Sequence, residues 1–180
     1  MKNVNQVHNR EEYYGEGARR YGRRYKNFHW TSVEILFNLI YTYDVTATHL
    51  ARRLSTHELS LSAFNVLMIL NRSEGKGCAL RELSDLLLVT RANVTGLVDC
   101  LVERKLVERF EDKRDRRIRI ARITDRGEKL LETILPDYYS MVRELARGLN
   151  KDEKAALSKL LTKMRESVQL AQRKTSATNE

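Results

Sequence analysis

Residues 79–123 constrain the fold more than any other part of the chain, because the spacing of their apolar residues changes in a defined order. Apolar residues recur at three- and four-residue intervals over 79–87 and again over 91–105. This spacing predicts two short helices separated by a tight turn. Thr90 is the natural N-cap of the second helix. The residues expected to face inward are Leu80, Leu83, either Leu86 or Leu87, and then Val94, Leu97, Val98 and Leu101.

The period changes to about two after residue 105. Residues 106–110 and 118–123 alternate in the way typical of two short strands, and every residue of the connecting loop 111–117 is charged. A helix, a turn, a second helix and a charged hairpin in this order form a winged-helix module. The second helix of such a module fits the major groove of DNA, and its N-terminal residues face the base edges. The arginines of the hairpin reach a phosphate row or a narrow minor groove.

Two further helices are predicted before this module. Apolar residues at helical spacing indicate a helix over 30–53, with Thr31 or Ser32 as its N-cap and Glu34 in its first turn. A second helix over 62–72 leaves almost no polar face, so we expect it to be buried. A turn that contains two glycines ends this helix before the module begins.

Two helices are also predicted after the module. Thr124 caps a long helix that runs to residue 145, and Pro136 within it should kink or divide the helix. A final helix begins at Asn150, because Glu153 three residues later completes a capping box. The expected fold class is therefore mainly α with a two-stranded β-wing: a winged helix–turn–helix with flanking helices.

The two ends of the chain differ from this pattern. Residues 1–28 form a basic, Tyr/Arg-rich N-terminal extension in which three glycines weaken any helix, and residues 173–180 form a tail that we expect to be flexible. The formal net charge is +9, and residues 1–30 alone hold 7 basic and 3 acidic side chains. The extension is compatible with three roles, namely an arm along DNA, an additional dimer contact, or a disordered basic tail.

Composition and spacing exclude several other classes of protein. No apolar run approaches the roughly 18 residues of a membrane span, and the polar N-terminus lacks a secretory signal, so we expect a cytoplasmic protein. The two cysteines form no CxxC pair. No catalytic arrangement and no glycine-rich phosphate loop is present, so we predict no enzyme activity, no metal and no cofactor. The four histidines show no metal-ligand spacing and are expected at surface or structural positions: His8, His29, His49 and His57.

The helix–turn–helix and the hairpin resemble a known family. Residues 82–99 read ELSDLLLVTRANVTGLVD and resemble the helix–turn–helix of the MarR family of bacterial transcriptional regulators. Residues 112–117 (DKRDRR) and 123–127 (ITDRG) resemble that family's wing and the start of its fifth helix. One position departs from the pattern, because Leu88 stands in the turn where helix–turn–helix motifs often have glycine.

The resemblance implies a homodimeric, sequence-specific regulator of transcription, most often a repressor. Residues 29–58 and 124–172 would then be dimerisation helices, within a domain over 29–172 whose DNA-binding part is 79–123. Two recognition helices would read a pseudo-palindromic operator about one helical turn apart. Many members of this family lose affinity for DNA when a small, often aromatic, anion binds between the dimerisation and DNA-binding regions.

The resemblance also implies which residues contact DNA. The start of the second helix would face the major groove through Thr90, Arg91, Ala92, Asn93 and Thr95. Asn93 can read an adenine, because its amide matches N6 and N7 of that base. Arg114 would enter the minor groove from the tip of the wing. Arg116 and Arg117 would contact phosphate or pair with two aspartates. These aspartates, Asp112 and Asp115, fix the loop.

An effector site rests on weaker indications. Aromatic and basic residues lie on or near the first long helix, which borders the pocket of the family: His29, Trp30, Phe37, Tyr41, Arg52 and Phe64. A small aromatic or anionic effector would suit such a lining, but an aromatic stripe at helical spacing also serves as core or dimer interface. Redox sensing by Cys78 or by a half-buried Cys100 is an alternative mode of regulation.

Two other functions are compatible with these features. An architectural DNA-binding protein without strong sequence preference would have the same basic surface, and the ratio of specific to non-specific affinity separates it from a regulator. The second is a winged helix that binds only protein partners, for which replacement of Arg114 by alanine would cause no loss of affinity.

Overall fold

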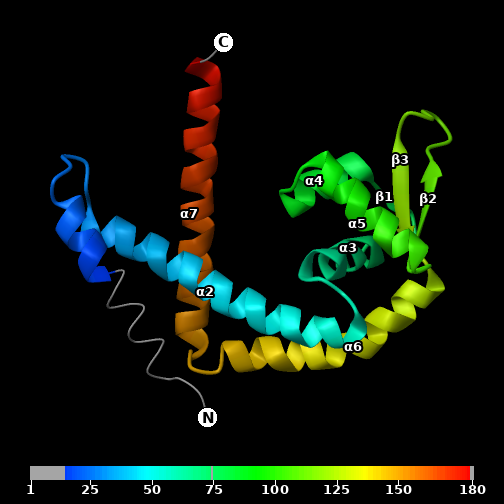
Figure 1. The fold of residues 1–180 in the computed structure, drawn as a ribbon, viewed down its shortest axis with the longest axis horizontal. Helices are drawn as coiled ribbons and strands as arrows, with labels where there is room; N and C mark the ends of the chain where they lie inside the picture. Colours follow the sequence, from blue (N-terminus) through cyan, green and yellow to red (C-terminus); the bar gives the residue numbers. More distant parts are fainter. Residues whose placement is uncertain (1–14, 74, 179–180) are drawn as a thin grey trace. The chain divides into compact units, whose positions relative to one another are not determined.

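The structure, a computed structural model, describes residues 15–73 and 75–178. The chain divides into two compact units, Met1–Leu61 and Ser62–Glu180, whose elements are drawn in Figure 1. The first half of the predicted extension, which includes His8, and the last two residues of the predicted tail lie outside the described residues. No helix in the described part of the chain is long and apolar enough to cross a membrane.

The first unit contains one long helix. α2 spans Trp30–Leu54, which confirms the predicted helix, and a short 3-10 helix, η1, follows at Ser55–His57. The predicted N-caps, Thr31 and Ser32, are wrong, and the first turn contains no acidic residue. The N-cap is His29, because its carbonyl oxygen accepts the first backbone hydrogen bonds of the helix; its side chain makes no capping bond.

A short helix precedes α2, although the glycines of this segment predict a weak one. Residues 15–22 are helical, and two consecutive turns then lead toward α2. Gly22 allows this arrangement, because a Cβ at this position would overlap the ring of Phe28. The local packing therefore outweighs the low helix propensity of glycine.

In the second unit, α3 supplies much of the hydrophobic core. It spans Leu61–Asn71, close to the predicted bounds, and its buried side chains are Ala63, Phe64, Val66, Leu67 and Leu70. The ring of Phe64 packs against Tyr138, with the ring centroids 5.0 Å apart. Burial of each large apolar side chain contributes about 1.5–3 kcal/mol, so this helix is a main source of stability for the unit. The prediction of a buried helix is confirmed.

The predicted helix–turn–helix is present in the second unit. α4 spans Leu80–Leu87 and α5 spans Arg91–Glu103. The inward residue at the end of α4 is Leu87, because the side chain of Leu86 is 58% exposed. In the predicted apolar stripe of α5, Val94, Val98 and Leu101 are inaccessible to solvent and Leu97 is half-buried.

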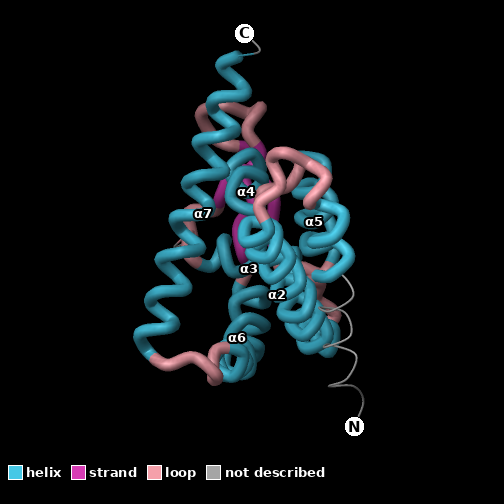
Figure 2. The backbone as a smooth tube through the Cα atoms, turned by 90° about the vertical axis from the view of Figure 1, so that its left-hand side faces the viewer, coloured by secondary structure: helices cyan, strands magenta, loops and turns pink. Residues whose placement is uncertain are grey.

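Three strands form one small antiparallel sheet in the order β1-β3-β2, drawn in magenta in Figure 2. The predicted hairpin is confirmed, with β2 at Val107–Glu111 and β3 at Arg119–Ile123. The third strand, β1 at Cys78–Ala79, is an addition to the predicted two-stranded wing, because two residues are too few to show a period. Cys78 pairs with Ala121 of β3, so the residues just before α4 are joined to the wing by backbone hydrogen bonds.

Two long helices follow the wing. α6 spans Asp125–Leu145 and α7 spans Lys151–Thr178, so α7 continues past residue 173, where the flexible tail is predicted to begin. Pro136 does not divide α6, but the axis of the helix changes direction along its length (Figure 1). The capping box is confirmed: Asn150 Oδ1 accepts a hydrogen bond from the Glu153 amide at 3.0 Å, and Glu153 Oε2 accepts one from the Asn150 amide at 2.7 Å.

Candidate nucleic-acid interface

The turn between α4 and α5 is closed by a residue in the left-handed region. Leu88 has φ 55° and ψ 40°, and its amide and that of Val89 both donate to the carbonyl oxygen of Ser84. Glycine is common at such a helix end, because the Cβ of any other residue costs roughly 1–2 kcal/mol in this conformation. The Leu88 side chain is 91% exposed, so packing does not offset this strain. The turn thus keeps its usual shape without the usual glycine.

The start of α5 is exposed on one face and anchored on the other. Thr90 is the N-cap, as predicted, and its Oγ1 accepts a hydrogen bond from the Asn93 amide at 3.3 Å. The hydroxyl of Thr95 donates to the Arg91 carbonyl oxygen at 3.0 Å, which leaves its methyl group and oxygen lone pairs for a base edge. The residues predicted to contact the major groove are all exposed: Thr90, Arg91, Ala92, Asn93 and Thr95.

Gly96 belongs to the same face and is not among the predicted contacts. It is exposed, and a Cβ at this position would meet nothing within 4 Å, so its own unit does not require a glycine. It follows Ala92 by one helical turn, so two small residues lie one above the other on the exposed face. The spacing of Ala92 and Gly96, four residues apart on a helix, is a signal that the sequence already contains. Such a pair of small side chains leaves room for another molecule to approach the helix backbone closely.

The wing loop is held by two aspartates that bond to backbone amides. Asp112 Oδ1 accepts hydrogen bonds from the amides of Arg114 at 2.7 Å and Asp115 at 3.0 Å, and Asp115 Oδ1 accepts one from the amide of Arg117 at 2.9 Å. The amides of Asp115 and Arg114, in that order, hold the pKa of the Asp112 carboxyl below its ordinary value of 3.8. The aspartates therefore fix the loop, as predicted, through its backbone.

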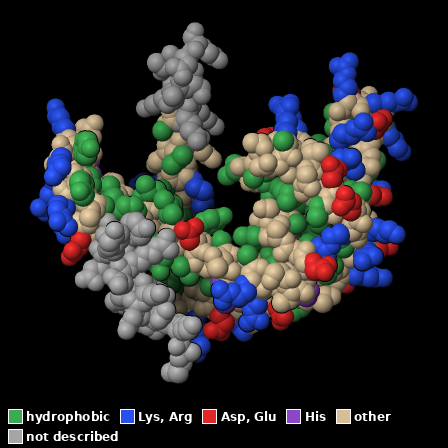
Figure 3. Space-filling model, viewed as in Figure 1, with side chains coloured by type: hydrophobic (Ala, Val, Ile, Leu, Met, Phe, Trp, Pro, Cys, Tyr) green, Lys and Arg blue, Asp and Glu red, His purple; other side chains and the backbone are tan. Residues whose placement is uncertain are grey.

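The cations of the wing fall into two groups. Three arginines on the strands pair with carboxylates: Arg109 with Asp99 at 2.6 Å, Arg119 with Glu111 at 2.7 Å and Arg122 with Glu108 at 2.6 Å. The loop cations have no ion pair with any described residue: Lys113, Arg114, Arg116 and Arg117. Figure 3 shows Lys and Arg side chains gathered around the end of the β2–β3 hairpin. The loop thus presents uncompensated positive charge at its tip.

The pair formed by Arg109 and Asp99 is a feature of the site that sequence reasoning missed. It joins β2 to the middle of α5, and both side chains are partly exposed. Because one partner lies on the helix and the other on the wing, the pair holds these two parts of the unit together. No regular spacing links positions ten residues apart across a turn, so only the folded structure identifies it.

Burial argues against redox sensing by Cys78, whereas redox sensing by Cys100 stays a prediction. Cys78 is buried, and burial, with a smaller effect of the Glu82 carboxylate, raises the pKa of its thiol to about 12. A thiol with such a pKa is not a nucleophile at neutral pH. Cys100 is exposed rather than half-buried, because it lies on the outer face of α5 between the buried Val98 and Leu101.

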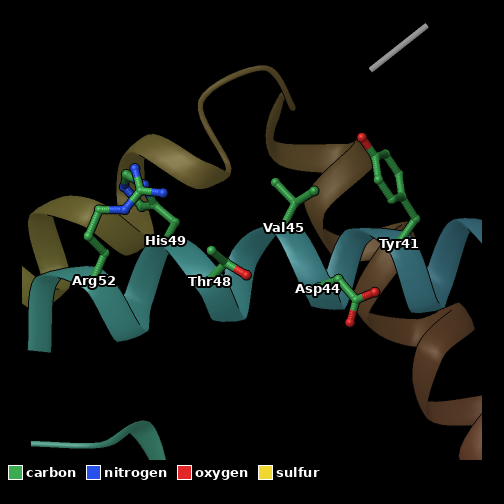
Figure 4. A pocket seen from close by; sticks show the side chains of 6 residues that line it. All are labelled: Tyr41, Asp44, Val45, Thr48, His49 and Arg52. Atoms are coloured by element: carbon green, nitrogen blue, oxygen red, sulfur yellow. The ribbon is translucent and has the colours of Figure 1, made fainter. Parts of the chain in front are cut away.

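A shallow hollow on α2 contains two of the six predicted effector residues. It has a volume of about 360 Å³ and is lined by Tyr41, Asp44, Val45, Thr48, His49 and Arg52, all from this helix (Figure 4). The side chains of His49 and Arg52, three residues apart, lie next to each other, and Tyr41 lies at the other end of the hollow (Figure 4). The lining therefore combines a cationic end with an aromatic ring.

The other four predicted effector residues do not line the hollow. His29 is exposed as the N-cap of α2, and Trp30 lies under the guanidinium of Arg19 at 5.3 Å from the ring centroid. Phe37 is 38% exposed on α2. Phe64 is 1% exposed in the core of the second unit, against Tyr138. These four side chains therefore do not line the hollow that contains Tyr41 and Arg52, and their role as effector contacts stays a prediction.

Comparison with known proteins places this arrangement in context. Residues 57–118 match the family model described as the MarR family. The chain is 31% identical over 116 residues to the HTH-type transcriptional regulator YkoM of Bacillus subtilis, covering 64% of this chain and 73% of YkoM. It is 28% identical over 113 residues to the transcriptional repressor MprA of Escherichia coli, covering 63% of this chain and just under two thirds, 64%, of MprA.

Two solved structures show the same fold. A MarR mutant from E. coli, solved in complex with operator DNA, is 26% identical with a TM-score of 0.67, covering 77% of this chain and 99% of that one. Bordetella bronchiseptica BpsR, whose DNA binding is regulated by 6-hydroxynicotinic acid, is 26% identical with a TM-score of 0.66, covering 73% and 98%. The mainly helical winged helix–turn–helix fold is therefore confirmed.

Proposed function

Because this chain belongs to the MarR family of helix–turn–helix transcriptional regulators, which are not enzymes, we propose that it is a sequence-specific repressor of transcription that binds double-stranded DNA. We further propose that it acts in the cytoplasm as a homodimer and leaves its operator when a small aromatic or anionic effector binds. MprA, a relative, is a transcriptional repressor, and the similar MarR structure holds operator DNA.

One observation carries the proposal of DNA binding: the exposed face of α5 and the unpaired cations of the wing loop belong to one unit. Asn93 is exposed in the first turn of α5, where a recognition helix presents its side chains to base edges. Arg114, Arg116 and Arg117 have no carboxylate partner among the described residues, so phosphates can neutralise them. We assign Arg114 to the minor groove and the other two arginines to the DNA backbone.

The proposed dimer rests on apolar side chains that their own chain leaves exposed. α7 has no buried side chain over residues 151–171, yet Leu157, Leu160 and Val168 form a stripe on one face, each 45–62% exposed. α2 likewise exposes Ile35, Leu36 and Ile40. Amphipathic helices obtain most of their stability from packing of the apolar face, so a second copy of the chain is the proposed partner.

The proposed effector site is the hollow on α2. Its Arg52 and His49 would bind a carboxylate, and Tyr41 would contact an aromatic ring. The relative BpsR responds to 6-hydroxynicotinic acid, an aromatic acid of a size that such a hollow can hold. A thermal-shift panel of aromatic acids tests this part: wild type should be stabilised by one of them, and an Arg52→Gln variant should not.

Selection of binding sites from a random duplex library tests the proposed function. The selected site should bind at least about 10³ times more tightly than random DNA at the same salt concentration. Asn93→Ala should lower affinity by about 1–3 kcal/mol and relax the preference at one position, whereas Arg116→Ala should weaken all sequences alike. Matched controls at exposed positions of α3 and α6, Asn65→Ala and Arg143→Ala, should behave as wild type.

The outcome also separates the rival functions. A specificity ratio near one would identify an architectural DNA-binding protein instead of a regulator. Equal losses on selected and random DNA for Asn93→Ala would contradict its role in reading a base. Unchanged affinity for Arg114→Ala would contradict the role of the wing.

A further inference from the structure

The segment before α2 is folded and strongly basic. Five of the eight residues 19–26 are Arg or Lys, and none is acidic. The proposed contacts of α5 and the wing do not use this charge. We call these eight residues the N-terminal basic segment.

Local contacts hold this segment in one shape. The amides of Arg24, Tyr25 and Phe28 donate to the carbonyl oxygens three residues earlier, at 3.3, 2.9 and 3.1 Å. The ring of Phe28 lies so close to Gly22 that a Cβ there would overlap it. The turns therefore fold back onto the helix over 15–22, and the segment differs from the disordered basic tail that is one reading of the sequence.

Two cations of the segment rest on aromatic rings, and the other three have no partner in the part of the chain that the structure describes. Arg19 lies over Trp30, and Arg24 lies over Tyr21, each with 5.3 Å between the guanidinium carbon and the ring centroid. Among the described residues, the other three cations have no ion pair and no ring contact: Arg20, Arg23 and Lys26. All five cations are exposed. The structure thus keeps this charge in solvent, where a polyanion can neutralise it.

The exposed tyrosines complete the surface. Tyr21 is 65% and Tyr25 is 73% exposed, so their hydroxyl groups can donate to phosphate oxygens beside the cations. Insertion into a membrane needs an apolar face, and the apolar rings nearby, Phe28 and Trp30, are occupied by Gly22 and Arg19. Within residues 19–28, the exposed cations and phenol hydroxyls lie together without an exposed aliphatic side chain, which favours a phosphate backbone over a lipid surface.

We propose that the N-terminal basic segment binds the phosphates of duplex DNA outside the site that α5 and the wing contact. This inference rests on the proposed function, because it requires the protein to be on DNA already. The segment adds affinity that does not depend on base sequence but does depend on how far the duplex extends beyond the site.

The test compares duplexes that carry the selected site with and without about one helical turn, roughly 10 base pairs, of arbitrary sequence on each side. The variant is the triple substitution Arg20→Gln, Arg23→Gln and Lys26→Gln, which spares the two arginines on aromatic rings. The control removes the same charge from exposed positions of α7 by Lys154→Gln, Lys159→Gln and Lys163→Gln. Emission of Trp30, the single tryptophan of the chain, reports whether the segment stays folded in the variant.

Wild type and the α7 control should bind the flanked duplex more tightly than the bare one, with a steeper dependence on salt. The triple variant should bind both duplexes alike, and its slope of log affinity against log salt should fall by roughly 0.9 for each phosphate that the segment no longer neutralises. Trp30 emission without DNA should match wild type. Equal binding of the flanked duplex by variant and wild type would overturn the inference, and so would an equal weakening on the bare duplex or a weakening shared by the α7 control.

Failure of this inference is distinguishable from failure of the proposed function. If the bare selected site binds tightly and depends on Arg114 while flanks add nothing, the segment does not contact DNA but the regulator function holds. If no duplex is preferred over random DNA, the proposed function fails whatever the segment does. Binding of the segment to anionic phosphatidylserine vesicles, without a flank effect on DNA, would assign it to a lipid surface and overturn the proposal.

Discussion

Among single residues, Leu88 shows how a departure from a motif is accommodated. The motif position commonly holds glycine, and the sequence indicates only that glycine is missing there. The structure adds the sign of φ, +55°, and shows that the side chain projects into solvent. The chain therefore forms the turn with a strained backbone at Leu88, and no contact of its side chain offsets this strain.

Replacement of Leu88 by glycine should stabilise the protein. The change removes the steric cost of the left-handed conformation, roughly 1–2 kcal/mol, and adds a smaller entropic cost, so the gain is up to about 1 kcal/mol. Urea denaturation followed by circular dichroism measures it. Leu86→Gly is the control, because Leu86 is also exposed but lies inside α4, where glycine should destabilise by about 1 kcal/mol. A lower midpoint for Leu88→Gly would contradict the assignment of strain.

Asp112 should make the wing loop sensitive to acid. Its carboxylate accepts two backbone hydrogen bonds, so its pKa is lowered in the folded loop. A lowered pKa means that the stabilisation is complete above the ordinary value of 3.8 and is lost as the pH falls through the lower, folded value. The amide NMR signals of Arg114 and Asp115 should therefore keep their positions from pH 7 to about 4 and shift below it.

Two variants check the cause of this pH dependence. Asp112→Asn keeps an oxygen that accepts hydrogen bonds but cannot titrate, so these signals should no longer follow the pH in that window. Asp112→Ala should disorder the loop at all pH values and weaken DNA binding at pH 7. Loop signals that still shift in the Asn variant would show that another group is responsible.

At the scale of elements, Thr124 joins the wing to α6. Its Oγ1 accepts a hydrogen bond from the Gly127 amide at 3.2 Å and donates one to the Lys105 carbonyl oxygen at 2.8 Å. Gly127 is required at this junction, because a Cβ there would overlap the carbonyl oxygen of Leu106. The cap thus ends one element and positions the next at the same time.

Loss of this cap should cost more than loss of a solvent-exposed cap. Thr124→Ala should lower the free energy of unfolding by about 1–2 kcal/mol, because one amide and one carbonyl lose their partner. Thr124→Ser retains the hydroxyl and should lie close to wild type. Chemical denaturation of the three proteins measures the difference, and an alanine variant as stable as the serine variant would contradict the role of the hydroxyl.

The helices and strands show which parts of the fold the sequence predicts and why it misses the others. Periodicity identifies α5, the hairpin and the caps Thr90, Thr124 and Asn150, because these depend on neighbouring residues. Periodicity does not identify β1, because this strand forms only through its pairing with β3. Nor does it identify the helix over 15–22, because this helix depends on the packing of Phe28 against Gly22. The exposed residues of α5 that we propose as DNA contacts follow from the apolar stripe, but which arginines remain unpaired depends on cross-strand partners.

At the scale of the whole molecule, α7 is the element that its own unit supports least. It is 28 residues long and has no buried side chain over residues 151–171. A helix with so little packing is marginal in water by itself. The proposed second copy of the chain accounts for the apolar stripe that is left exposed.

Introduction of a charge into this stripe should disrupt the dimer. Wild type should elute at twice the chain mass of 21.0 kDa in size-exclusion chromatography with light scattering, and Leu160→Glu should shift toward 21.0 kDa on dilution. Lys159→Gln changes the net charge by the same amount on the opposite face of α7 and should remain dimeric. A wild-type mass of 21.0 kDa at micromolar concentration would contradict the proposed assembly.

The contrast between the two cysteines allows a label to be attached to α5 selectively. Cys78 is buried and stays protonated, because its pKa is about 12, whereas Cys100 is exposed on α5. A maleimide spin label or dye should therefore attach to one position per chain without any engineered substitution. In the proposed dimer, the separation of two such labels measures the distance between the two copies of α5 with and without an effector. The chain already contains the attachment point for a test of the proposed response to an effector.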